Sequence, residues 1–173
     1  MNPVLIAYAT QYGSTREVAE KVAEILAERG VEASVRSARD VNSLDDYSAV
    51  VLGGALYFFR LHKDARRFLS RHRKALMDRP VAVFAMGPFN DTEEEFAGAR
   101  KHLDRALSKK PWLSPVSVSV FGGRFDPTGL RFPHKNPAMK QMPASDIRDW
   151  DAIRAWAETL PQALGLKRSE VEA

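Results

Sequence analysis

The chain has 173 residues, of which 45% are hydrophobic and 28% charged, a composition typical of one folded domain rather than a disordered or fibrous chain. It has no cysteine, which excludes disulfides, thiolate metal sites and cysteine nucleophiles and favours a reducing, cytoplasmic location. We find no signal-peptide pattern and no run of about 18 apolar residues, so we expect no membrane span. The net charge of +4 suits an anionic partner.

The first predicted elements are a buried strand and an amphipathic helix. Residues 4–9 form a short apolar run, typical of a strand buried on both faces. A polar turn follows. From Ser14 apolar residues recur at helical spacing as far as Gly30, where a helix would stop. The order is therefore strand, turn, helix.

The rest of the chain repeats this alternation. The further predicted strands are residues 32–37, 49–54, 80–86 and 116–121, and the further predicted helices are residues 61–76, 92–108 and 150–164. Strands that alternate with helices form right-handed crossovers and a parallel sheet covered on both faces. We therefore predict an α/β fold, a three-layer sandwich with a five-stranded parallel sheet, in a single domain over residues 1–166.

Two segments fall outside this alternation. Residues 122–148 contain four prolines and are too long for a routine connection, so we predict an irregular loop that is functional or loosely ordered. Residues 167–173 form a polar tail. Ligands bind at the carboxyl ends of the strands in such sheets. The connections after the strands, at residues 10–15, 54–62, 87–91 and 122–148, are therefore the candidate binding segments.

The loop after the first predicted strand is rich in hydroxyl groups. It lacks the Gly-Lys-Ser/Thr of a P-loop and the three glycines of a dinucleotide fingerprint. It leads directly into a helix, whose N-terminal N–H groups and dipole favour an anion. Thr10, Ser14 and Thr15 can donate hydrogen bonds to a phosphate monoester. Alternatively, Ser14 and Glu17 form a capping box and the loop binds nothing.

Aromatic residues follow two other predicted strands. Tyr57, Phe58 and Phe59 come directly after a glycine-rich strand end, and Phe89 follows the next strand. Three consecutive bulky residues cannot all point into the core, so at least one should lie in the ligand crevice. Together with the hydroxyl-rich loop they favour a flat heterocycle that carries a phosphate. Packing against the following helix is the alternative for each ring taken alone.

Other site types have little support. The four histidines lack metal-ligand spacing, so we predict no metal site. Glu93, Glu94 and Glu95 complement the dipole of the predicted helix 92–108. Residues 60–79 hold eight basic and two acidic side chains, either a solvated helix face or a surface for an anionic partner. No nucleic-acid recognition motif accompanies them, so we expect no nucleic-acid partner.

The loop at residues 9–15 with the helix after it resembles the phosphate loop of flavodoxin-like proteins. Residues 50–62 and 149–153 are similar to the flavodoxin-domain family that includes menaquinone-dependent protoporphyrinogen dehydrogenase. The resemblance implies FMN as the cofactor and no catalytic side chain, because the flavin itself carries the electrons. The implied cofactor-binding residues are Thr10, Gln11, Tyr12, Gly13, Ser14, Thr15, Ala55, Leu56, Tyr57, Phe58, Phe59, Gly87, Pro88, Phe89 and Asn90.

The function that this resemblance implies is an FMN-dependent oxidoreductase of the protoporphyrinogen or quinone type. Residues 122–148 would then shape a pocket for a small redox substrate, and an anionic membrane surface is a candidate contact. One alternative is an electron carrier that acts with a redox protein. Such carriers are usually acidic around the flavin, which the net charge of +4 disfavours. A second alternative is a binding or regulatory module without flavin.

Overall fold

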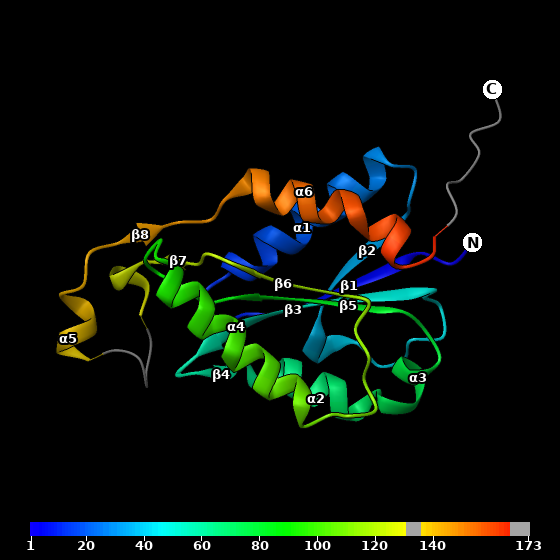
Figure 1. Ribbon diagram of the computed structural model, residues 1–173, viewed down its shortest axis with the longest axis horizontal. Coiled ribbons are helices and arrows are strands. Elements are labelled where there is room, and N and C mark those ends of the chain that lie inside the picture. Colours follow the sequence, from blue (N-terminus) through cyan, green and yellow to red (C-terminus); the bar gives the residue numbers. More distant parts are fainter. Residues whose placement is uncertain (131–135, 167–173) are drawn as a thin grey trace.

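The computed structural model describes residues 1–130 and 136–166 (Figure 1). Its central feature is a parallel sheet with the strand order β2-β1-β3-β5-β6. The strands are β1 (Val4–Ala9), β2 (Ala33–Ser37), β3 (Ala49–Tyr57), β5 (Val81–Met86) and β6 (Ser117–Phe121). The predicted α/β fold with five parallel strands is confirmed. The strand order reverses at β1, which places a topological switch point between β1 and β3.

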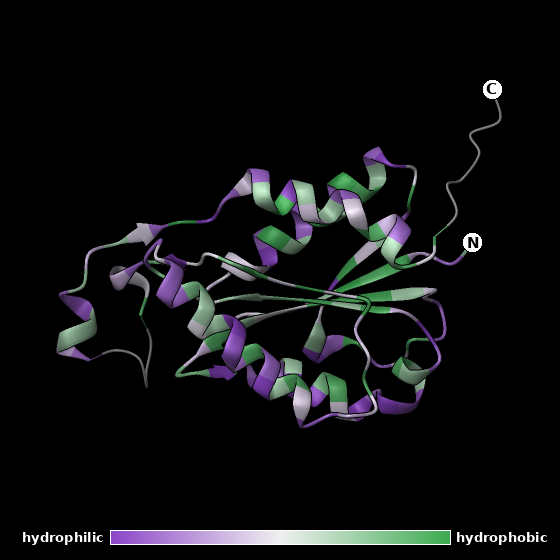
Figure 2. Cartoon of the chain, viewed as in Figure 1, coloured by the Kyte–Doolittle hydropathy of each residue, from purple (hydrophilic) through white to green (hydrophobic). Residues whose placement is uncertain are grey.

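Helices cover both faces of this sheet. One face carries α1 (Ser14–Glu28) and α6 (Trp150–Ala163), and the other carries α2 (Lys63–Arg71), α3 (Arg73–Met77) and α4 (Glu93–Ser108) (Figure 1). Two buried apolar clusters fill the spaces between these layers, one on each side of the sheet. Figure 2 shows the same division, with mostly hydrophobic strands between helices that carry many hydrophilic residues.

The strand register brings the loops after β1, β3 and β5 to one edge. Ala9 pairs with Gly54, and Gly54 pairs with Ala85. β1 and β5 therefore end beside Gly54 and Ala55 of β3, and β3 continues past them to Tyr57 at the same edge. Position 53, one residue before Gly54, requires glycine because a Cβ there would lie 2.1 Å from the ring of Phe84. The close approach of ring and backbone keeps β3 and β5 packed where the loops begin.

The predicted helix over residues 61–76 is interrupted. The structure divides it into α2 and α3 at His72, whose buried imidazole Nε2 lies 3.1 Å from the carbonyl oxygen of Val41. Val41 follows the short 3-10 helix η1 (Ala38–Asp40). No Gly or Pro marks the break, so helical periodicity alone did not reveal it.

The segment 122–148 is more regular than predicted. It contains β7 (Arg124–Phe125) paired antiparallel with β8 (Ser145–Asp146), the 3-10 helix η2 (Pro127–Gly129) and α5 (Pro137–Lys140). A further short strand, β4 (Arg60–Leu61), pairs antiparallel with the end of β3. Residues 131–135 of the segment 122–148 and the predicted tail 167–173 lie outside the described residues. Among the described helices, none is long and apolar enough to cross a membrane.

Candidate functional site

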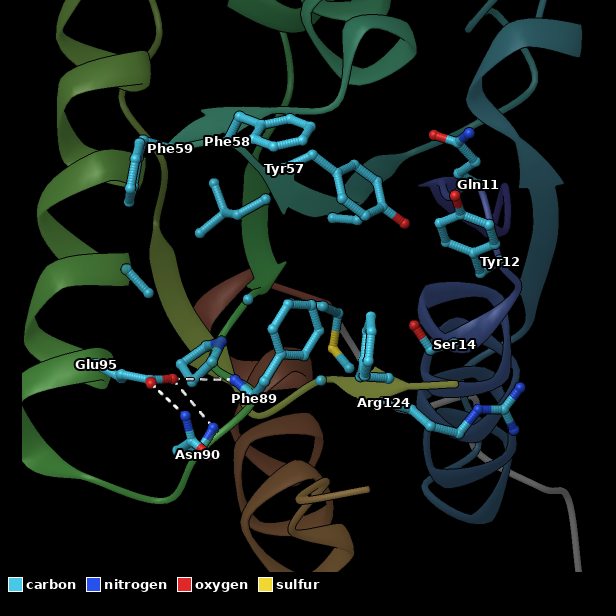
Figure 3. A pocket seen from close by; sticks show the side chains of 18 of the residues that line it. Gln11, Tyr12, Ser14, Tyr57, Phe58, Phe59, Phe89, Asn90, Glu95 and Arg124 are labelled. Carbon is cyan, nitrogen blue, oxygen red and sulfur yellow. Dashed lines mark hydrogen bonds between the residues drawn. The ribbon is translucent and has the colours of Figure 1, made fainter. Parts of the chain in front are cut away.

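A cavity of about 1080 Å³ opens at the carboxyl edge of the sheet (Figure 3). Its walls come from the loops after β1, β3 and β5, from one face of α4 and from the segment after β6. The sequence-predicted residues that line it are Gln11, Tyr12, Ser14, Ala55, Leu56, Tyr57, Phe58, Phe59, Gly87, Pro88, Phe89 and Asn90. Thr10 and Gly13 lie in the loop after β1 and Thr15 lies in the first turn of α1, but these three are not among the lining residues. The three predicted segments therefore do meet at one cavity.

The first loop is shaped to begin a helix without a side-chain cap. Gly13 is the N-cap of α1, with a φ of 90°, and its N–H donates to Oγ1 of Thr10 at 3.0 Å. A positive φ is a conformation that glycine adopts at little cost. Because the cap is Gly13 and no side chain caps the helix, the capping box of Ser14 and Glu17 is wrong.

The hydroxyl of Thr15 is the unusual group of this loop. Thr15 is completely buried, and its Oγ1 has no hydrogen-bond partner among the described residues. Buried hydroxyls nearly always have a partner, so one without a partner calls for an explanation. Ser14, its neighbour, lines the cavity. The N-terminal turn of α1 thus offers hydroxyl groups and backbone N–H groups to an anion.

Tyr57 joins the end of β3 to this loop. Burial raises the pKa of its phenol to about 12, and hydrogen bonding with the Gln11 backbone and the Thr10 side chain opposes that rise. The phenol therefore stays protonated at neutral pH. The ring of Tyr12 lies edge-on to that of Tyr57, with 6.1 Å between centroids. In Figure 3 both tyrosines stand beside Gln11 at one end of the cavity.

The turn after Tyr57 holds two aromatic residues in a left-handed conformation. Phe58 and Phe59 have φ values of 46° and 64°, and they connect paired residues Tyr57 and Arg60 as a two-residue hairpin turn. Such turns prefer Asn-Gly, and strained residues cost about 1–3 kcal/mol each. The two residues are 65% and 75% exposed, yet both line the cavity. The strained turn presents two rings to a ligand or partner.

The loop after β5 is fixed by an acidic residue of α4. Oε2 of Glu95 accepts hydrogen bonds from the N–H groups of Phe89 and Asn90 at 3.1 and 3.0 Å, and Oε1 accepts one from Nδ2 of Asn90 at 2.6 Å (Figure 3). The hydrogen bonds from Asn90, chiefly that of its side chain, lower the pKa of Glu95. Thr92 is the N-cap of α4, and its Oγ1 accepts a hydrogen bond from the N–H of Glu95 at 3.2 Å.

Sequence reasoning missed one wall of the cavity, the face of α4 that carries Gly98, Ala99 and His102. A further wall comes from the predicted candidate segment 122–148, in which sequence reasoning singled out no individual residue; those that line the cavity include Gly123, Arg124, Phe125, Leu130 and Met139. A Cβ at Gly98 would meet only open space. Nδ1 of His102 is buried without a hydrogen-bond partner among the described residues, and its ring lies 4.8 Å from that of Phe59. Gly98, Ala99 and His102 follow Glu95 at helical spacing, so this spacing would have placed them on the same face of α4 as Glu95.

The basic residues after β3 lie apart from this cavity. A second hollow of about 860 Å³, between η1 and α2, is lined by Arg39, Lys63, Arg66, Arg67 and Arg71. Arg60 and Lys63 do not line the first cavity. Within residues 1–130 and 136–166, no group of three or more acidic or histidine side chains is placed to hold a metal ion.

Comparison with known proteins decides the family. The model of the flavodoxin domain family matches residues 5–146. The chain belongs to this family. Membership implies a flavin cofactor, and it explains why the loops after β1, β3 and β5 enclose a cavity at the switch point.

Individual relatives agree with this assignment. Protoporphyrinogen IX dehydrogenase (quinone) of Escherichia coli K12 is 28% identical over 106 residues, which are 57% of this chain and 59% of that protein. The match thus covers less than two thirds of either chain. Oxidised flavodoxin 2 of Bacillus cereus has a TM-score of 0.60 at 18% identity, covering 92% of this chain and 98% of that one. An archaeal flavodoxin has a TM-score of 0.59 at 13% identity, covering 94% and 99%. Both structures support the fold.

Proposed function

We propose that the protein binds FMN in the cavity at the carboxyl edge of the sheet and acts as an FMN-dependent oxidoreductase of the protoporphyrinogen or quinone type. One observation carries the proposal. A single cavity connects the hydroxyl-bearing N-terminal turn of α1, through Ser14, with the aromatic residues Tyr57, Phe58, Phe59 and Phe89. That arrangement suits a ligand with a phosphate at one end and a flat ring at the other.

The phosphate end fits the residues present. Thr15 supplies a buried hydroxyl without a partner among the described residues, and Ser14 supplies a second hydroxyl beside it. In this proposal both hydroxyls and the N–H groups of the first turn of α1 hold the phosphate. The loop has one glycine and lacks the glycine-rich fingerprint that holds a pyrophosphate, which favours the monophosphate FMN over FAD.

The residues at the other end of the cavity fit the isoalloxazine ring of FMN. Phe89 is held by the contact of its N–H with Glu95, and its ring lies 5.3 Å from that of Phe125. Offset or edge contacts between aromatic rings add about 0.5–1.5 kcal/mol to the burial of apolar area. When bound, the isoalloxazine supplies the redox chemistry. The chain's own residues bind the ring, orient it and exclude water from one side of it.

The segment after β6 favours a small-molecule substrate. Its residues Gly123, Phe125, Leu130 and Met139 form a wall of the cavity opposite the loop after β3. A wall at this place would enclose a small substrate beside the flavin. The E. coli relative is named for protoporphyrinogen IX and quinone, and for this chain both substrates are part of the proposal.

An electron carrier is the second candidate. The exposed rings of Phe58 and Phe59 favour it, because exposed aromatic residues beside a redox site are suited to contact a partner protein. Arg60 directly follows Phe59 in the chain, and its charge together with that of Lys63 would select an acidic partner or substrate.

Reoxidation kinetics distinguish these functions. The flavin of the loaded protein would be reduced anaerobically and mixed with a quinone, with oxidised redox proteins of acidic or basic charge, or with oxygen alone. Reoxidation that saturates with the quinone supports the enzyme, as does reduction of the oxidised flavin by a porphyrinogen. Fast reoxidation by a redox protein alone supports the carrier. A protein that takes up no FMN would contradict both and favour the module without flavin.

A further inference from the structure

Four charged residues join the segment after β6 to the first turns of α1. Glu17 of α1 contacts Arg124 of β7 and Arg148, and Arg148 also contacts Asp146 of β8. We call these four residues the ionic cluster. Its formal charges cancel. The cluster lies next to the proposed phosphate site, since Glu17 follows Ser14 by three residues, or about 4.5 Å along a helix axis.

Arg148 is the fixed cation of the ionic cluster. Its side chain is only 6% exposed. Its guanidinium donates to both carboxylate oxygens of Asp146 at 2.9 and 2.7 Å and also donates to Glu17. The ring of Trp150 lies 4.9 Å from its Cζ. These contacts hold the Arg148 side chain in place.

Arg124 is the loosely held cation. Its Nη1 lies 3.5 Å from Oε2 of Glu17, longer than the usual charged hydrogen bond of about 2.7–2.9 Å. Its side chain is 38% exposed, and it lines the same cavity as Ser14. Figure 3 shows the side chain extending from β7 toward α1, below Ser14.

A phosphate at the N-terminus of α1 changes the electrostatics of this cluster. A phosphate monoester carries a charge of about −1.5 to −2 at neutral pH. Glu17 lies within about one helical turn of this N-terminus, so its carboxylate would repel the phosphate. A guanidinium that contacts Glu17 is close enough to the first turn of α1 to contact the phosphate as well. Guanidinium groups bind phosphate by strong, charge-assisted hydrogen bonds.

We propose that Arg124 is the cationic partner of the FMN phosphate, and that Glu17 holds its guanidinium at the N-terminal turn of α1 until the phosphate is bound. The inference rests on the proposed FMN site. It also gives the segment after β6 a role in flavin binding, because Arg124 sits between Gly123 and Phe125 in the cavity wall.

The test compares two ligands that differ only in the phosphate. Apoprotein would be titrated with FMN and with riboflavin, following the quenching of flavin fluorescence. The variants are Arg124→Gln, Arg124→Lys and Glu17→Gln. Arg16→Gln is the matched control, because Arg16 is in the same turn of α1 but pairs with Glu20 and is not among the cavity residues.

Opposite effects are expected for the two members of the ion pair. Arg124→Gln should weaken FMN about tenfold, the loss typical of one charged hydrogen bond, and change riboflavin by less than about twofold. Arg124→Lys should recover part of the loss. Glu17→Gln should strengthen FMN binding severalfold, since it removes a repelling charge and releases Arg124. A gain in affinity cannot come from a misfolded variant.

Three results would overturn the inference. They are an equal loss of FMN and riboflavin in Arg124→Gln, weaker FMN binding in Glu17→Gln, and the same FMN loss in Arg16→Gln as in Arg124→Gln. Either of the first two results would show that the ionic cluster only stabilises the fold. The third would show that the loss of FMN affinity comes from the change in net charge and not from a contact of Arg124. Failure of the proposed function looks different, because then the unmodified protein would itself fail to bind FMN more tightly than riboflavin.

Discussion

The carboxylate of Glu95, in the first turn of α4, accepts a 3.1 Å hydrogen bond from the backbone N–H of Phe89. This contact fixes the loop after β5 from a helix that begins only a few residues later. The ring of Phe89 is thereby held in the cavity, where we place the isoalloxazine.

Replacing Glu95 by Gln should loosen this loop. The amide keeps one acceptor but loses the charge that strengthens three hydrogen bonds, so flavin affinity should fall roughly fivefold, or about 1 kcal/mol. The fluorescence titration measures the loss. Glu93→Gln removes the same charge from the same turn and is the control. Equal losses in both variants would show that Glu95 acts only through the helix dipole.

The pH dependence of the same contact has a defined sign. Hydrogen bonding lowers the pKa of Glu95 below its ordinary value of 4.5. A carboxylate with a lowered pKa in the folded protein stabilises it fully above the ordinary value, and the contribution is lost as the pH falls through the lowered pKa. The stabilities of the unmodified protein and Glu95→Gln should therefore differ above pH 4.5 and converge as the pH falls through the lowered pKa of Glu95. Curves that stay parallel would contradict this assignment.

Thr15 offers a test of the phosphate end. Thr15→Val preserves the shape of the buried side chain but removes the hydroxyl, so FMN should bind about tenfold more weakly while riboflavin is little affected. The apoprotein should be as stable as before, or more stable by about 1 kcal/mol, because an unsatisfied buried hydroxyl is lost. Thr15→Ser is the control that keeps the hydroxyl. If Thr15→Val binds FMN normally, the hydroxyl has no part in the site.

The strained turn predicts that relieving its strain raises the stability of the protein and weakens binding in the cavity. Phe58→Asn combined with Phe59→Gly introduces the residues that this hairpin turn prefers, and we expect the free energy of unfolding to rise by about 1–2 kcal/mol. The same change removes two cavity rings, so flavin or substrate binding should weaken. Denaturant unfolding and flavin titration measure the two effects. A variant that loses stability would show that the rings are mainly structural.

The basic residues near the turn predict salt-dependent association. Arg60→Glu with Lys63→Glu should slow reoxidation by an anionic substrate or an acidic protein at low salt, and the difference should fade once the Debye length shortens to about 8 Å at physiological ionic strength. Arg73→Glu with Lys74→Glu, on α3, makes the same change of charge elsewhere. A solvated helix face without a partner predicts no salt-sensitive difference between these two variants.

Much of the fold followed from local patterns. The five parallel strands and the helices α1, α4 and α6 have strong periodicity and recognisable ends, so their predicted ranges nearly match the structure. The aromatic residues after β3 and β5 were found because strand ends in such sheets converge on one edge. β3 itself is longer than predicted, since Phe58 and Phe59 form a turn that carries none of the usual turn residues.

Contacts between distant segments were not predictable. Glu17 and Arg148 are 131 positions apart in the chain, and no spacing rule connects an acidic residue of one helix with a basic residue near another. The break at His72 depends in the same way on a contact with Val41. The cavity wall from α4, and the individual residues of the segment 122–148 that line the cavity, appear only once the sheet order and helix packing are fixed.

The central claim is that this chain holds FMN. The most direct measurement is the absorption spectrum of the purified protein, followed by release and identification of the chromophore. The account predicts flavin absorption bands and one FMN per chain, or stoichiometric uptake of added FMN by colourless protein. Protein that is colourless and takes up no FMN, or that releases FAD instead, would contradict it.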